Sequence, residues 1–314
     1  MIDKNLLLIS HIADEDGLTP VILAKLVYKN VTPILLNPGE VDKAYLENVD
    51  NYDLVHITDL NISEDLAKQI NENEKLKGKT LIFDHHQSAI NLNKYDFIEV
   101  VTEENNQKQS ASSLYYKYLL TISENPLLHK ESTKGLIEQV RIIDTYDFKT
   151  EEDKKTLNLD YLFSILGREN YITYFEDYIK NNDKFEYTKE ENFLIKLQKD
   201  KIDNYITNKA KEMMLANLEG HKVGIVYAES NRSLLGNYLV ENNDIDFAVV
   251  INIARSVSYR GKDKVDLSVF SAKHHGGGHK NASGSPLPKN ILKDVTKLIF
   301  DDVTFIEQKE EEHE

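Results

Sequence analysis

The segment Thr80-Leu81-Ile82-Phe83-Asp84-His85-His86 joins a short apolar run to three polar residues that can bind a metal ion. An apolar run of this length, bounded by polar residues, is typical of a buried β-strand. Two other apolar runs end in the same way, because residues 6–10 are followed by His11 and residues 54–58 by Asp59. The residues of chemical interest therefore stand at the ends of predicted strands.

Helical patterns separate these runs and indicate the fold. Strands are predicted over residues 6–10, 32–36, 54–58 and 80–83, and helices over residues 20–28, 41–49 and 63–74. Strands that alternate with helices form a parallel, doubly wound α/β sheet, in which ligands bind outside the carboxyl ends of the strands. We therefore expect His11, Asp59 and the run Asp84-His85-His86 to meet at one edge of such a sheet.

A fourth acidic segment follows a predicted helix rather than a strand. The pattern of residues 132–143 is helical, and it ends by presenting Asp144. Asp147 lies three positions further on and would share that face if the helix continued, so it is the rival of Asp144. Carboxylates and imidazoles together suit a hard divalent cation, and a pair of such cations can clamp both the attacking and the leaving oxygen of a phosphate ester.

Composition excludes several classes of protein. The 314-residue chain has no cysteine, which excludes zinc fingers and iron–sulfur clusters. Its formal net charge of −15 argues against a protein that coats long nucleic acid, because that binding depends on many Lys and Arg contacts to phosphates. No apolar run is long enough to cross a bilayer, and the first residues lack the pattern of an export signal, so the expected location is cytoplasmic.

The second half of the chain predicts a separate, smaller α/β domain. We expect a first domain over residues 1–187, a helical linker over 188–218, a second domain over 219–305 and an acidic tail over 306–314. Within the second domain, strands are predicted over residues 222–227, 247–253, 257–260 and 265–270, with a helix that begins near Ser233.

A glycine-rich run in the second domain is the other strong signal. It reads His274-His275-Gly276-Gly277-Gly278-His279, and a plain flexible hairpin is its simpler interpretation. Consecutive glycines let backbone amides approach an anion closely. The chain has five arginines, and Arg260 precedes this run, where its planar guanidinium would suit phosphate oxygens; Arg232 and Arg255 are weaker choices.

These motifs together resemble the DHH phosphoesterases, which are named for the Asp-His-His that here is Asp84-His85-His86. The glycine-rich run that ends at His279 resembles the signature of the C-terminal domain associated with that family. The resemblance extends over nearly the whole chain. Within the family, the chain is most similar to the oligoribonuclease, or nano-RNase, branch, which degrades very short RNA and related dinucleotides.

The resemblance implies a role for each site residue. It makes His11 and Asp14 ligands of one metal and Asp16, His85 and Asp144 ligands of the other, with Asp59 between the two. Asp84 would orient the histidines, and His86 would face the scissile phosphate. Glu15 is an alternative ligand, because the spacing after His11 differs by about one residue from several branches of the family. The family usually employs manganese, and magnesium is the alternative ion.

The expected activity is a metal-dependent phosphodiesterase that hydrolyses short oligoribonucleotides or dinucleotides through two-metal activation of water. The second domain would hold the far end of the substrate through Arg260, Gly276, Gly277, Gly278 and His279. No membrane partner is expected, and the sequence leaves a homodimer open. Two alternatives are a RecJ-like exonuclease for single strands and a catalytically silent nucleotide-binding regulator.

Overall fold

A computed structural model describes residues 1–150, 152–300 and 302–305. Contacts between Cα atoms divide the chain into two compact units, Met1–Lys199 and the residues from Asp200 onward. The division falls inside helix α8 (Lys189–Ala210). The expected acidic tail over residues 306–314 lies outside the described residues.

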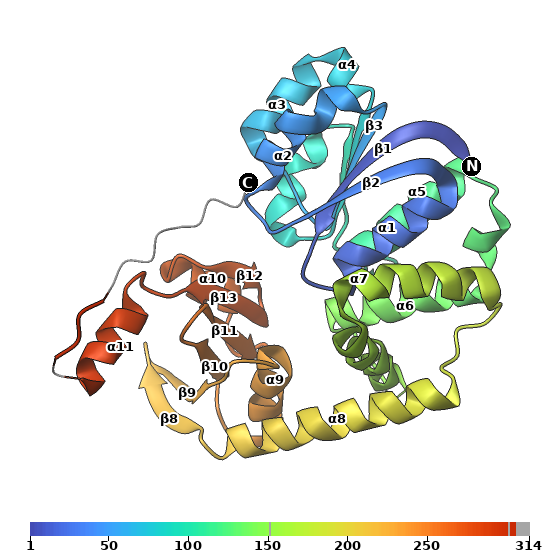
Figure 1. The fold of residues 1–314 in the computed structure, drawn as a ribbon. Coiled ribbons are helices and arrows are strands. Elements are labelled where there is room, and N and C mark those ends of the chain that lie inside the picture. Colours follow the sequence, from blue (N-terminus) through green and yellow to red (C-terminus); the bar gives the residue numbers. More distant parts are fainter. Residues whose placement is uncertain (151, 301, 306–314) are drawn as a thin grey trace. The chain divides into compact units, whose positions relative to one another are not determined.

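The first unit is built on a sheet of five parallel strands, which confirms the predicted doubly wound α/β fold (Figure 1). The spatial order is β2-β1-β3-β4-β5, so the direction of strand addition reverses between β1 and β3. The strands are β1 (Ile2–His11), β2 (Tyr28–Leu36), β3 (Leu54–Thr58), β4 (Thr80–Asp84) and β5 (Ile98–Val100).

Helices cover both faces of this sheet (Figure 1). Alternate residues of β1 face opposite sides, and Leu7 and Ile9 pack into a core with residues of α2 and α3. On the other face, the His56 ring of β3 packs against Tyr115 of α5. The helices are α1 (Glu15–Val27), α2 (Val41–Asn48), α3 (Glu64–Glu72), α4 (Glu74–Lys77), α5 (Ala111–Ile122), α6 (Glu131–Thr145) and α7 (Leu157–Asn181).

Short elements complete the first unit. A two-stranded hairpin, β6 (Glu103–Glu104) and β7 (Gln107–Lys108), precedes α5. The 3₁₀ turns are η1 (Val49–Asn51), η2 (Gln87–Lys94), η3 (Pro126–His129) and η4 (Asp153–Thr156). Among the described residues of both units, no helix has the length and apolar character needed to span a membrane.

The second unit contains a six-stranded mixed sheet in the order β12-β13-β11-β10-β9-β8. Phe247, Tyr259, Leu267 and Phe270 form its apolar core with neighbouring side chains. The strands are β8 (Met214–Leu218), β9 (His221–Tyr227), β10 (Phe247–Asn252), β11 (Ser256–Gly261), β12 (Gly277–His279) and β13 (Ala282–Pro286), and the helices are α9 (Arg232–Asn242), α10 (Leu267–Lys273) and α11 (Ile291–Ile299).

Several expected boundaries differ from the structure, among them that of β2, which begins at Tyr28 instead of residue 32. The strand predicted over 265–270 is wrong, because Asp266 accepts hydrogen bonds from the amides of Ser268 and Val269 and starts helix α10. The helix predicted over 188–218 ends at Ala210, since Met214–Leu218 pairs with β9 as an edge strand. Helix α1 begins before residue 20, because Asp14 caps it by accepting from the Gly17 amide.

Candidate active site

The predicted site residues of the first unit converge at one edge of the parallel sheet. His11 is the last residue of β1, Asp59 directly follows the neighbouring β3, and Asp84 is the last residue of β4 on the far side of β3. The boundary between β1 and β3 is also where the strand order reverses. In open α/β sheets this is the place where a crevice for ligands forms.

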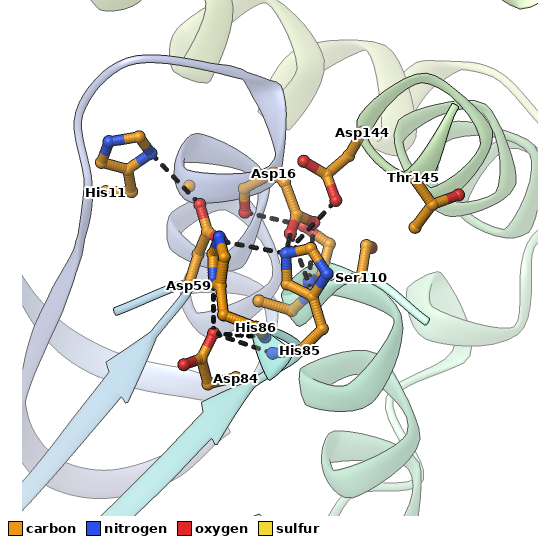
Figure 2. A network of polar contacts seen from close by, with 12 residues as sticks. His11, Asp16, Asp59, Asp84, His85, His86, Ser110, Asp144 and Thr145 are labelled. Atoms are coloured by element: carbon orange, nitrogen blue, oxygen red, sulfur yellow. Dashed lines mark hydrogen bonds and ion pairs between the residues drawn. The ribbon is translucent and has the colours of Figure 1, made fainter. Parts of the chain in front are cut away.

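One group of ligand atoms consists of His11, Asp14 and Asp59, whose donor atoms lie within 4.8 Å of one another. Nδ1 of His11 lies 3.2 Å from Oδ2 of Asp14 and 3.3 Å from Oδ2 of Asp59. Figure 2 shows the His11 ring turned toward the Asp59 carboxylate. The first predicted ligand set is therefore brought together by the fold.

A second group consists of Asp16, His85 and Asp144. Nε2 of His85 lies 3.7 Å from Oδ2 of Asp16 and 3.3 Å from Oδ2 of Asp144. The same nitrogen lies 3.3 Å from Oδ1 of Asp59. In Figure 2 dashed lines join the His85 ring to these carboxylates, which all face the same ring nitrogen.

Asp59 connects the two groups. Its Oδ2 faces His11 and its Oδ1 faces His85, each at 3.3 Å, and its side chain is 3% exposed. Its backbone is left-handed, with φ of 56°, a conformation that aspartate tolerates better than most residues. The position between two donor groups is the one that a bridging ligand needs, and the bridging role itself stays a prediction.

The turn after β1 is shaped by Gly17 and Ser10. A Cβ atom at position 17 would lie 2.1 Å from the carbonyl oxygen of His11, so only glycine allows α1 to start so close to the end of β1. The buried Ser10 hydroxyl bonds to Gly17 O at 2.6 Å and to Oγ1 of Thr58 at 2.7 Å. These bonds tie the ends of β1 and β3 to the helix that carries Asp14 and Asp16.

Asp16 is held by the N-terminus of α5, which the sequence analysis missed. Its two carboxylate oxygens accept from the backbone amides of Ala111 at 2.8 Å and Ser112 at 2.9 Å. The first four amides of a helix lack intrahelical partners, so they attract a carboxylate. Ser110 and Ser113 form a capping box at this end, and the run Ser110-Ala-Ser-Ser113 was the available sequence signal.

Asp84 holds the two histidines that follow it. Its Oδ1 lies 2.7 Å from Nδ1 of His86 and accepts from the amide of His85 at 2.8 Å. Its Oδ2 accepts from Nδ2 of Asn61 at 3.3 Å, a contact that the sequence did not reveal. Asp84 is fully buried, whereas the His86 side chain is 39% exposed. These contacts are those that an orienting carboxylate would make.

The protonation equilibria show that the site has an excess of negative charge. Burial alone would lower the pKa of His11, but its hydrogen bonds to Asp14 and Asp59 outweigh burial and raise the pKa to about 10. Burial would raise the pKa of Asp59, but hydrogen bonds to His11 and His85 outweigh it and lower the pKa to about 2. The histidines thus act as counter-charges for the carboxylates in the absence of a cation.

The two carboxylates of the second group, Asp16 and Asp144, have pKa values above the ordinary range. Burial, reinforced by the charge of Asp59, raises the pKa of Asp16 to about 6. Burial also raises the pKa of Asp144 well above its ordinary value, against the opposing effect of His85. Both shifts have the direction expected where like charges share a buried site, and a bound cation would reverse them.

The residues fit a divalent cation. Oδ2 of Asp144 is buried and accepts no hydrogen bond from any residue that the structure describes. A buried carboxylate oxygen that accepts no hydrogen bond is costly even with the His85 imidazole 3.3 Å away, and coordination of a cation would satisfy it. The donors are carboxylate oxygens and imidazole nitrogens, which suit Mn²⁺ or Mg²⁺ better than a soft, thiolate-binding ion.

The two alternative ligands lie elsewhere. Asp147 forms ion pairs with Arg141 at 3.1 Å and Lys149 at 3.3 Å, so Asp144 and not Asp147 lies against His85. Glu15 is buried and belongs to none of the donor groups found among the described residues. Burial and the charge of Asp160 raise the pKa of Glu15 well above its ordinary value.

The glycine-rich run of the second unit forms a hairpin of β12 and β13. A Cβ atom at Gly276 would lie 2.0 Å from Gly284 O, and Gly278 has a φ of +136°, so packing within the hairpin requires both glycines. A Cβ atom at Gly277 would meet no described atom within 4 Å. The run therefore does form a hairpin. Binding of a ligand by these glycines and by His279 stays a prediction.

Arginine side chains of the second unit lie near the start of α9. Arg260 donates to the Tyr259 carbonyl at 2.8 Å and to the Ser233 hydroxyl, and its stem packs against Gly236. Arg232 donates to the Ser256 hydroxyl at 2.7 Å. The substrate contact assigned to Arg260 stays a prediction.

The chain is similar to known proteins of one family. The model of the DHH family, N-terminal domain, matches residues 5–140. Oligoribonuclease NrnB of Bacillus subtilis (strain 168) is 31% identical over 294 residues, which cover 89% of this chain and 72% of that protein.

Two solved structures share the fold. The pGpG-specific phosphodiesterase PggH from Vibrio cholerae matches with a TM-score of 0.51 at 13% identity, over 94% of this chain and 97% of that chain. Exonuclease RecJ bound to manganese matches with a TM-score of 0.50 at 13% identity, over 93% of this chain and 88% of that chain.

Proposed function

Because the chain belongs to the DHH family of phosphoesterases, we propose that it is a divalent-cation-dependent phosphodiesterase that hydrolyses short oligoribonucleotides or dinucleotides. The observation that carries the proposal is the position of Asp59, which faces His11 with one carboxylate oxygen and His85 with the other. Two donor groups joined by one carboxylate are what a pair of cations requires.

In this proposal His11 and Asp14 hold one cation, and Asp16, His85 and Asp144 hold the other, with Asp59 shared. Manganese is the preferred ion, since the family resemblance points to it and the related RecJ structure contains it. When bound, the cations supply positive charge for the phosphate oxygens and lower the pKa of a coordinated water.

The residues of the chain then hold the ligand groups in position and polarise the scissile phosphate. The α5 amides fix the direction in which the Asp16 carboxylate points. Asp84 fixes His86 through Nδ1, so the exposed ring can donate a hydrogen bond to an oxygen of the scissile phosphate through its other nitrogen. No protein nucleophile is required, because water attacks the phosphate.

The short length of the substrate is supported by the relatives and by charge. NrnB is an oligoribonuclease, and PggH is specific for a dinucleotide. A net charge of −15 is unfavourable for the extended phosphate contacts of a RecJ-like channel. We further propose that residues 1–187 form the catalytic domain and that residues 219–305 bind substrate through Arg260, the glycine hairpin and His279.

Hydrolysis by chelator-treated protein tests this function. With Mn²⁺ restored, the protein should hydrolyse a 5′-phosphorylated diribonucleotide much faster, per molecule, than a long single strand. Asp65→Asn, which changes a carboxylate that is 90% exposed, is the matched control for Asp59→Asn. A preference for the long strand would favour the RecJ-like alternative, whereas tight dinucleotide binding without turnover would favour the silent regulator.

A further inference from the structure

We propose that Tyr146, supported by Phe148, is a stacking platform for one of the two nucleobases that flank the scissile phosphate. The inference rests on the proposed function, and it adds a specificity-determining residue that lies outside the ligand groups. Its basis is an exposed aromatic ring on a rigid turn immediately after Asp144.

The position of Tyr146 is the first reason. It stands two residues after Asp144, whose Oδ2 lies 3.3 Å from Nε2 of His85. Consecutive Cα atoms are about 3.8 Å apart, so the Cα of Tyr146 lies no more than about 7.6 Å from that of Asp144. Tyr146 is nevertheless 45% exposed, so a large apolar ring reaches solvent beside the proposed cation site.

The backbone of Tyr146 is the second reason. Tyr146 caps the C-terminus of α6 in the left-handed region, with φ of 53° and ψ of 38°. Its amide bonds to Ile143 O at 3.2 Å, and the next amide bonds to Ile142 O at 3.1 Å, which closes a Schellman motif. Glycine or asparagine normally fills this position, because a bulky side chain is strained there. Strained residues of this kind cluster at functional sites.

The turn around Tyr146 is held rigidly on both sides. The Arg141 guanidinium, whose side chain is 6% exposed, donates to Asp147 at 3.1 Å. Nζ of Lys108 donates to the carbonyl of Thr145 at 3.0 Å. The ring of Phe148 packs edge-on against that of Tyr146, with the centroids 4.7 Å apart and the planes at 83°. An aromatic surface prepared in this way binds with a smaller entropy cost.

A nucleobase is the ligand that fits this surface best. Bases stack on aromatic side chains irrespective of sequence, because every base has a π face. The phosphate of a dinucleotide would lie at the cation site, so one attached base comes within reach of the residues next to Asp144. The anionic carboxylates nearby disfavour a second phosphate on the same surface.

Steady-state kinetics with Tyr146→Asn tests the platform. Asparagine tolerates the left-handed conformation and preserves the helix cap, so the variant removes the ring with little strain. We expect KM for a diribonucleotide to rise about tenfold with little change in kcat, the effect of one lost base–aromatic stack. Tyr146→Phe should have a lower KM than Tyr146→Asn, and Phe193→Asn, at a ring 62% exposed in α8, is the control.

Substrates that lack one base separate stacking from a general disturbance of the site. For a dinucleotide that is abasic at the stacked position, Tyr146→Asn and the wild-type protein should have the same KM. If Tyr146→Asn has the wild-type KM for the complete dinucleotide, the platform is refuted while the proposed function stands. A rise in KM that is equal for both abasic substrates would also refute it.

Fluorescence gives a readout that does not depend on turnover. The chain has no tryptophan, so Tyr146→Trp introduces a single reporter. A dinucleotide should quench its emission, ribose 5-phosphate should not, and Phe193→Trp should respond to neither. If the dinucleotide quenches the emission but the wild-type protein does not hydrolyse it, the proposed function is refuted and the stacking platform stands. If the dinucleotide does not quench the emission, the stacking platform is refuted.

Discussion

The edge of the parallel sheet and the glycine hairpin of the second unit both stood out in the sequence, but their residues are needed for different reasons. At the sheet edge, the buried Asp59 and His85 lie beside the half-buried His11, and each histidine faces the Asp59 carboxylate at 3.3 Å. In the hairpin, Gly276 and Gly278 are required by the backbone of the neighbouring strand. A motif can therefore mark chemistry or packing, and the surrounding atoms distinguish them.

Asp59→Asn should have the largest effect, because one substitution removes a donor from both groups. We expect kcat/KM for a dinucleotide to fall by more than about 10³-fold, beyond the roughly 10- to 100-fold loss typical of outer partners of a metal site. Circular dichroism of the variant should match that of the wild-type protein. If Asp59→Asn is about as active as Asp65→Asn, then Asp59 is needed for packing, as Gly276 is in the hairpin, and not for catalysis.

The pH dependence of stability in the metal-free protein should be the next largest effect. The pKa of His11 is raised from 6.5 to about 10, so the stability it contributes is complete below about pH 6.5 and is lost as pH rises toward 10. The pKa of Asp16 is also raised, so the stability that this group contributes is lost as pH rises from about 4 to about 6. Each group contributes at most about 1.4 kcal/mol per pH unit within its window.

Urea unfolding between pH 6 and 10, with chelator and with Mn²⁺, measures this dependence. The cation should remove most of the decline, because it replaces the protonated His11 as the counter-charge of Asp14 and Asp59. A His11→Asn protein should show a shallower decline in chelator than the wild-type protein. An equally steep decline in both would mean that His11 is not the titrating group.

Asp84→Asn should have an intermediate effect on activity. It weakens the 2.7 Å contact with Nδ1 of His86 without removing a donor from the groups that contain His11 or Asp144. We expect kcat/KM to fall by about 10- to 100-fold, the range for partners that orient a metal site. A fall as large as that of Asp59→Asn would make Asp84 a direct ligand.

Alanine at Gly276 and at Gly277 should give the smallest effects and should differ from each other. Gly276→Ala forces a Cβ atom against Gly284 O, so we expect a loss of stability of about 1–3 kcal/mol. Gly277→Ala meets open space and should leave stability nearly unchanged. If Gly277→Ala weakens dinucleotide binding while the protein stays stable, the hairpin carries ligand contacts as well as packing.

Local signals in the sequence were sufficient for four of the five strands of the first sheet and for the convergence of its polar residues, but they did not reveal β5. Buried parallel strands read as short apolar runs, and strands such as β3 and β4 have their ligand candidates directly after them. The sheet geometry then brings distant residues together without further information.

Contacts between distant parts of the chain could not be read from the sequence. Asp16 bonds to amides that lie 95 and 96 residues further along, and only the packed fold brings α5 to it. The choice between Asp144 and Asp147 depended on the ion pair of Asp147 with Arg141. Short segments such as Met214–Leu218 and 265–270 were misjudged because edge pairing and the Asp266 cap decided their structure.

The number of Mn²⁺ ions bound per chain tests the central claim most directly. Equilibrium dialysis of chelator-stripped protein should give two ions for the wild type and for Asp65→Asn, and weakened binding of both ions for Asp59→Asn. Binding of a single ion by the wild type, or of two ions with unchanged affinity by Asp59→Asn, would contradict a site in which one carboxylate joins two cations.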